Sequence, residues 1–161
     1  MIKTILLLST SYALASAWFM PTMSFGYGSD DESTTHVDKD FVRDDARGVV
    51  INNKQAKIYY DGQPVQKMHF YEAWDYCQNL EYAGLNEWRV INKEEGRDLL
   101  ELSRRTIMVK HAFKNAQEAT YWTSTQDRFD NAWYVDFDLG RYSTQKQKTK
   151  SNVICVHEDK K

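Results

Sequence analysis

The chain has 161 residues, of which 21 are basic and 23 acidic, so its formal net charge at pH 7 is −2. This near balance excludes a generic binder of nucleic acids or other polyanions and leaves only local charged patches as electrostatic sites. The length suffices for one hydrophobic core and is too short for two ordinary domains once the N-terminal segments are set aside.

The N-terminus has the pattern of an export signal. Lys3 precedes an apolar run from Ile5 to Ala15, and Ala15-Ser16-Ala17 provides the small residues of a cleavage site. The alternative is an uncleaved anchor, but the run is shorter than the ~20 apolar residues of a spanning helix. We therefore predict a cleaved signal peptide over residues 1–17, and a periplasmic or secreted mature protein without a membrane span.

Composition divides the rest of the chain. Residues 18–40 pass from aromatic and Met-rich to Ser, Thr and Asp without a helical or strand period, which predicts a flexible linker. A globular pattern begins at Phe41, so we expect one domain over residues 41–157, followed by a charged tail at 158–161.

The domain opens with a predicted hairpin and a helix. Apolar runs at 48–51 and 56–60 flank the polar turn 52–55. Apolar residues then recur at spacings of three and four, which predicts a helix over 70–80. These residues are Phe70, Ala73, Trp74, Cys77 and Leu80.

A second helix is predicted from its N-terminal cap. Asn92 is followed three residues later by Glu95, which is the form of a capping box. We expect Leu99, Leu102 and Ile107 to form its buried face, although Gly96 weakens the first turn.

Aromatic and β-branched residues then return in three short runs, 121–124, 133–137 and 153–156, with a hairpin turn at 138–140. The order is two strands, two helices and then three or more strands. Segregated strands and helices predict an α+β domain with a mainly antiparallel sheet.

Four segments in order carry a resemblance to a known family. They are Phe41-Val42-Arg43-Asp44-Asp45, Ala83-Gly84-Leu85-Asn86-Glu87-Trp88-Arg89-Val90, Tyr121-Trp122-Thr123-Ser124-Thr125 and Ala132-Trp133-Tyr134-Val135-Asp136-Phe137. Together they resemble the Lcl C-terminal domain family of exported bacterial proteins, whose fold is related to that of C-type lectins. The resemblance covers about residues 41–157. One departure is visible, because the family usually has Leu-Pro where this chain has Val90-Ile91.

The resemblance implies a C-type-lectin-like fold in which a disulfide joins the first helix to the last strand. Cys77 and Cys155 match those two positions. The alternative is two free buried thiols, which an oxidising compartment disfavours.

The sequence offers little for catalysis or metal binding. A disulfide between the two cysteines leaves no thiolate for redox chemistry or for a metal. The four histidines are scattered, without a zinc spacing: His36, His69, His111 and His157. The calcium-binding motifs of C-type lectins are missing. We expect a non-catalytic, calcium-independent protein without a cofactor.

Candidate binding residues come from exposed aromatic and basic positions. Core packing is the favoured interpretation for Trp88, Trp122 and Trp133, and Arg89 is expected to satisfy a carboxylate or buried carbonyls. The expected exposed residues are Tyr134, Arg128, Phe129 and Arg141. Lys146, Lys148 and Lys150 would form a basic ridge if the stretch is a strand, or else protect a solvated edge strand from aggregation.

These features predict a monomeric envelope binding module. It would recognise a glycan, anionic if the lysines contribute, or an envelope protein surface through the loops at 125–132 and 142–152. The alternative is a non-catalytic structural subunit of a larger envelope complex.

Overall fold

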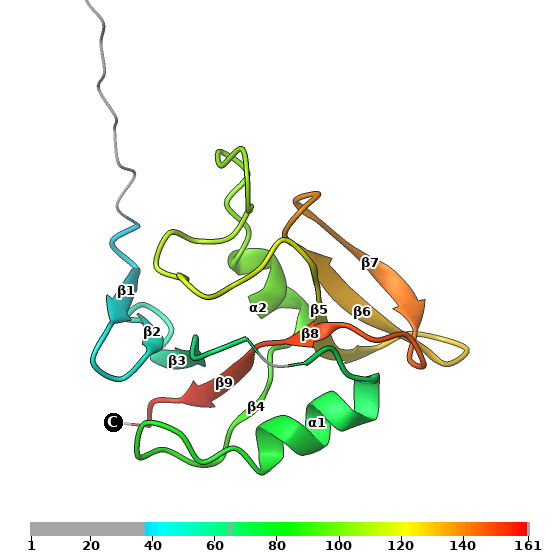
Figure 1. Cartoon of the computed structure of the whole chain (residues 1–161), viewed down its shortest axis with the longest axis horizontal. Helices are drawn as coiled ribbons and strands as arrows, with labels where there is room; N and C mark the ends of the chain where they lie inside the picture. Colours follow the sequence, from blue (N-terminus) through cyan, green and yellow to red (C-terminus); the bar gives the residue numbers. More distant parts are fainter. Residues whose placement is uncertain (1–37, 65, 161) are drawn as a thin grey trace, which may run out of the picture. The chain divides into compact units, whose positions relative to one another are not determined.

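The computed structural model describes residues 38–64 and 66–160. The predicted signal peptide and residues 18–37 of the predicted linker lie outside the described residues. Figure 1 shows two sheets with α1 (Phe70–Gln78) and α2 (Lys93–Asp98) packed against them. The predicted α+β class with two helices and mainly antiparallel strands is confirmed.

Five strands form the first sheet, all antiparallel. Their spatial order is β1 (Phe41–Asp44), β2 (Val49–Asn52), β3 (Lys57–Tyr60), β9 (Cys155–Glu158) and β4 (Arg89–Val90). The β2–β3 hairpin is the one predicted from the sequence, whereas β1 was not predicted as a strand.

Four strands form the second sheet, in which only the β5–β8 pair is parallel. Their order is β7 (Arg141–Lys146), β6 (Asn131–Asp136), β5 (Thr120–Gln126) and β8 (Asn152–Val153). The predicted turn at 138–140 joins β6 to β7, with Gly140 in the left-handed region (φ 60°).

The run 153–156, predicted as one strand, is divided between the two sheets. Val153 ends β8 and Cys155 begins β9, and the Ile154 carbonyl between them accepts a hydrogen bond from the Ile91 N–H at 3.2 Å. The chain therefore crosses from one sheet to the other at Ile154, which explains why one apolar run serves both.

Helix α1 has the predicted apolar stripe. Phe70, Ala73 and Cys77 are fully buried, and Cys77 forms a disulfide with Cys155 at the start of β9. The Cα atoms of the two cysteines are 5.5 Å apart. The predicted bridge from the first helix to the last strand is confirmed.

Helix α2 has the predicted N-terminal cap but is shorter than expected. The Asn92 side chain accepts from the Glu95 N–H at 2.8 Å, and the Glu95 carboxylate accepts from the Asn92 N–H at 2.7 Å. The helix ends at Asp98, so Leu99 is buried but Leu102 is 66% exposed, and its predicted burial is wrong. A Cβ on Gly96 would lie 3.3 Å from the Thr123 side chain, so glycine allows α2 to pack closely on the second sheet.

Candidate functional site

The most exposed aromatic side chain in the described part of the chain lies at the tip of the β5–β6 hairpin. Phe129 is 83% exposed, and both Phe129 and Asp130 have a left-handed backbone with φ of 58°. This conformation is unfavourable for a bulky residue such as phenylalanine. Backbone strain of this kind concentrates at functional sites, so the tip is a candidate for recognition.

The end of β7 holds the tip in place. The Gln147 N–H donates to the Asp130 carbonyl at 2.9 Å, and the Lys146 ammonium donates to the Phe129 carbonyl at 3.1 Å. The two loops that the sequence singled out, 125–132 and 142–152, are therefore in direct contact.

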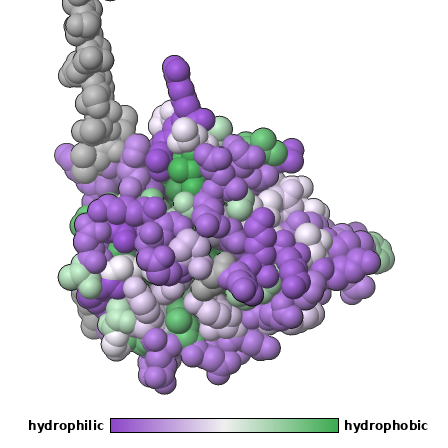
Figure 2. Space-filling model, viewed as in Figure 1, coloured by the Kyte–Doolittle hydropathy of each residue, from purple (hydrophilic) through white to green (hydrophobic). Residues whose placement is uncertain are grey.

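A groove of about 500 Å³ lies beside this tip, at the N-terminus of α1. We call it the tip groove, and it is lined by His69, Tyr71, Asp130, Lys146, Gln147 and Lys148. The Tyr71 side chain is 60% exposed, so a second aromatic ring is accessible there. The hairpin tip extends to the right in Figure 1, and Figure 2 shows a hydrophobic surface at that end among mainly hydrophilic atoms.

The predicted lysine ridge is wrong in its geometry. Strand β7 ends at Lys146, and the Thr149 N–H donates to the Lys146 carbonyl at 2.8 Å, which closes a turn. A turn has no period-two alternation, so the three lysines do not share one strand face. Lys146 and Lys148 line the tip groove, whereas Lys150 is exposed and does not.

Two other predicted residues lie away from the groove. Arg141 begins β7 at the opposite end of the strand, with its Nε 3.9 Å from an Asp136 carboxylate oxygen. Tyr134 was expected to be exposed but is half-buried, because it packs against the core cluster that includes Trp122 and Phe70. Arg128 is exposed at the tip, as predicted.

The three tryptophans expected in the core behave differently. Trp88 and Trp122 are buried, but Trp133 is only half-buried. The Lys93 Nζ at the start of α2 lies 3.5 Å from the centroid of the Trp133 ring. The first residue of α2 therefore covers this tryptophan with an ammonium group rather than with an apolar side chain.

Sequence reasoning placed Asp130 and Gln147 in the two predicted recognition loops without assigning them a role, and it missed His69 and Tyr71. Tyr71 carried a usable signal, because it is a large aromatic residue of α1 that falls outside the apolar stripe. The other three are ordinary polar residues, and tertiary contacts alone bring them together.

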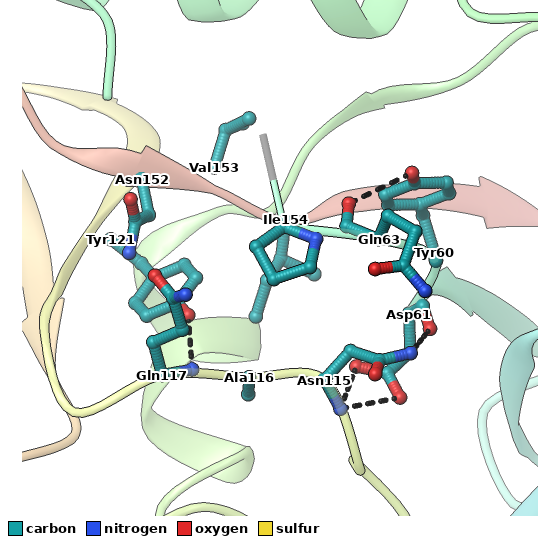
Figure 3. A pocket seen from close by; sticks show the side chains of 12 residues that line it. Tyr60, Asp61, Gln63, Asn115, Ala116, Gln117, Tyr121, Asn152, Val153 and Ile154 are labelled. Carbon is teal, nitrogen blue, oxygen red and sulfur yellow. Dashed lines mark hydrogen bonds between the residues drawn. The ribbon is translucent and has the colours of Figure 1, made fainter. Parts of the chain in front are cut away.

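A second pocket lies between β8 and the loop at 115–117, as Figure 3 shows. Its volume is about 30 Å³, the size of one water molecule, which excludes a sugar or peptide ligand. Asp61 lines it and accepts hydrogen bonds from the Lys114 and Asn115 N–H groups, at 2.9 and 3.2 Å. This pocket therefore marks where the long loop is anchored to the first sheet.

A buried ionic network fixes α2 to the first sheet. Glu95, 2% exposed, accepts hydrogen bonds from Lys57 at 2.6 Å and from two Arg89 nitrogens at 2.8 and 2.7 Å. Burial alone would raise the pKa of Glu95, but these cations and the Asn92 N–H outweigh it and lower that pKa to about 2. The expected carboxylate partner of Arg89 is confirmed, and its role is structural.

The described residues contain no cluster of three histidine, cysteine or acidic side chains suited to a metal ion. His69, His111 and His157 lie in separate parts of the fold, and His36 is outside the described residues. Within residues 38–64 and 66–160, no helix has the length and hydrophobicity needed to cross a membrane.

A comparison with curated proteins gives no match. The family model of the Lcl C-terminal domain matches residues 40–157. This range includes every helix and strand of the described residues except Glu158, the last residue of β9. The match covers most of the chain and contains the tip groove, the two helices and both cysteines. The chain therefore belongs to the Lcl C-terminal domain family.

Proposed function

We propose that this protein is an exported bacterial binding module with a C-type-lectin-like domain, and that its tip groove recognises an anionic glycan. Recognition is non-catalytic and independent of calcium. One observation carries the proposal: the exposed ring of Tyr71 and the two lysines Lys146 and Lys148 line one groove, and the exposed Phe129 lies at the adjoining hairpin tip, next to Asp130 of the lining.

The composition of the groove suits this ligand class. Tyr71 and Phe129 offer flat apolar surfaces on which a sugar ring can stack, and both rings lose little conformational entropy on binding. Lys148 has an exposed side chain that is free to approach a sulfate or carboxylate. The Gln147 side chain is already engaged with the Asn131 carbonyl at 3.3 Å and helps to keep the wall in position.

Export supports the same interpretation. The predicted signal peptide over residues 1–17 would deliver the domain to the periplasm or the medium, where extracellular polysaccharides are available. The disulfide between Cys77 and Cys155 is consistent with that oxidising environment.

The test is binding of the mature chain to dextran sulfate, with neutral dextran of the same length as control. We expect binding to dextran sulfate that weakens steeply between 50 and 300 mM salt, roughly the range over which screening becomes strong, and little binding to neutral dextran. Failure to bind any anionic polysaccharide on a glycan array would exclude the proposal. Co-purification with an envelope complex would then favour the alternative, a structural subunit of such a complex.

A further inference from the structure

Strand β7 is the free edge of the second sheet. It pairs with β6 on one side only, over six residues from Arg141 to Lys146. Figure 1 shows no other strand or helix along its outer side. Edge strands present a row of backbone groups to which another chain can pair.

The hydrogen bonds around the hairpin define which backbone groups face outward. In an antiparallel pair, residues alternate between bonded and non-bonded positions. The Gln147 N–H donates to Asp130, directly beyond the Asn131–Lys146 pair, so the bonded positions in β7 are 145, 143 and 141. The Phe137 N–H, just beyond the end of β6, donates to the Ala119 carbonyl on the β5 side. The backbone groups of 136, 134 and 132 in β6 therefore face β7, which agrees with the bonded positions 141, 143 and 145.

The backbone N–H groups of Tyr142, Thr144 and Lys146 therefore point away from the sheet. Within residues 38–64 and 66–160, no hydrogen bond reaches the outward groups of Tyr142 or Thr144, whereas the Lys146 carbonyl accepts from Thr149. Two complete donor and acceptor pairs and one further donor are thus available along the edge.

The charge along this edge is of one sign. Residues 141–150 contain four cations and no acidic residue. Arg141 and Lys146 occupy the two ends of the strand, and both are exposed. Tyr142, 42% exposed, lies between them and packs against Trp133 with ring centroids 5.9 Å apart and the ring planes tilted by 44°. An extended chain with carboxylates would be complementary to this edge in both shape and charge.

We propose that β7 binds an extended acidic peptide segment of a partner protein, which adds to the sheet as a further strand beside it. The backbone groups of Tyr142 and Thr144 supply the hydrogen bonds, and Arg141 and Lys146, whose side chains lie on opposite faces of the sheet, each select a carboxylate on their own face. This partner site goes beyond glycan recognition in the tip groove, with which it shares only Lys146.

The test uses the mature chain and a blocked peptide of sequence Glu-Val-Thr-Val-Thr-Glu, whose two glutamates are five positions apart and so lie on opposite faces of an extended strand, as Arg141 and Lys146 do. A second peptide has the same sequence and the same charges, but the backbone nitrogens of two adjacent central residues are methylated. Because neighbouring N–H groups of a strand point to opposite sides, one of the two methylated nitrogens faces β7 whichever way the peptide binds. We expect the unmodified peptide to bind and the methylated peptide to bind at least about tenfold more weakly, because in either register one of the two methyl groups faces β7, removes a hydrogen bond and leaves a carbonyl of β7 unpaired. Amide exchange on binding should slow at Tyr142 and Thr144 and stay unchanged at Ser143.

A pair of variants tests the same site on the protein. Thr144→Pro removes an outward N–H that no described residue uses, and edge strands tolerate proline at such positions. Thr144→Val keeps the N–H and serves as the matched control. Thr144→Pro should weaken peptide binding at least about tenfold while dextran sulfate binding, which also reports that the variant is folded, stays unchanged.

Two results would overturn this proposal. One is the absence of binding by the unmodified peptide. The other is equal binding by the two peptides, which would show that charge alone attracts them. This comparison uses the wild-type protein, so it remains valid even if Thr144→Pro does not fold. If the wild-type chain does not bind dextran sulfate but binds the unmodified peptide more tightly than the methylated one, the glycan proposal is contradicted and the peptide proposal is supported.

Discussion

The guanidinium of Arg89 and the buried carboxylate of Glu95 form a two-point hydrogen-bonded pair, with Nη1 2.8 Å from Oε2 and Nη2 2.7 Å from Oε1. Arg89 belongs to β4 and Glu95 to α2, so the pair holds the short helix against the first sheet. Such a pair stabilises the fold only while both groups are charged.

The first prediction concerns acid stability. The folded-state pKa of Glu95, about 2, lies below the ordinary value of 4.5 for a glutamate, so its contribution is fully present above about pH 5 and is lost as the pH falls toward 2. We expect roughly 3 kcal/mol of the free energy of unfolding to depend on this residue. Urea titrations between pH 7 and pH 2 should therefore show a smaller pH dependence for Glu95→Gln than for the wild type. Equal pH dependence would contradict the role assigned to Glu95.

The second prediction concerns the disulfide. The bridge between Cys77 and Cys155 closes a loop of 78 residues in sequence, which the chain-entropy model values at about 4 kcal/mol. Reduction, or the double variant Cys77→Ala with Cys155→Ala, should lower the free energy of unfolding by about that amount in urea. In the native protein, non-reducing mass spectrometry after alkylation should find no modified cysteine, and two modified cysteines would contradict the bridge.

The third prediction concerns Ile91, which stands where the resembled family usually has proline. The Ile91 N–H donates to the Ile154 carbonyl at the crossing between the two sheets, and proline has no N–H to donate. We expect Ile91→Pro to cost about 2–4 kcal/mol through the lost hydrogen bond and core packing. Ile91→Val, which keeps the N–H, should cost about 1 kcal/mol. Similar melting temperatures for both variants would show that the hydrogen bond contributes little.

The local parts of this fold were predictable, because short-range chemistry determines them. The Asn92–Glu95 cap and the β2–β3 hairpin depend on residues within a few positions of each other. The division of the run 153–156 was not predictable, because an apolar run does not indicate which sheet each residue joins. The burial of Leu102 was mispredicted because the apolar spacing continues past Asp98, where the helix ends.

The candidate site was predictable only in part for a similar reason. Phe129, Lys146 and Lys148 stood out as exposed residue types in loop-like sequence, and the structure brings them to one end of the molecule. The contribution of α1 depends on how the helix packs against both sheets, which no local pattern reports. The alternation of Lys146 to Lys150 suggested a strand, but the turn closed by Thr149 ends it.

The fourth prediction concerns calcium. The proposed recognition uses aromatic rings and ammonium groups rather than a bound ion. Millimolar calcium should therefore leave the melting temperature within about a degree of its value in magnesium, since an ion that does not bind the native state cannot stabilise it. A rise of several degrees with calcium alone would contradict calcium independence.

The measurement that tests the central claim most directly compares two lysines that differ in position but not in type. Lys148 lines the tip groove, and Lys150, two residues further along, does not, although both are exposed. Binding of the mature chain to dextran sulfate should weaken about fivefold in Lys148→Gln and in Phe129→Ala, and change less than about twofold in Lys150→Gln. Equal losses in Lys148→Gln and Lys150→Gln, with no loss in Phe129→Ala, would show diffuse attraction by surface charge and contradict a site in the tip groove.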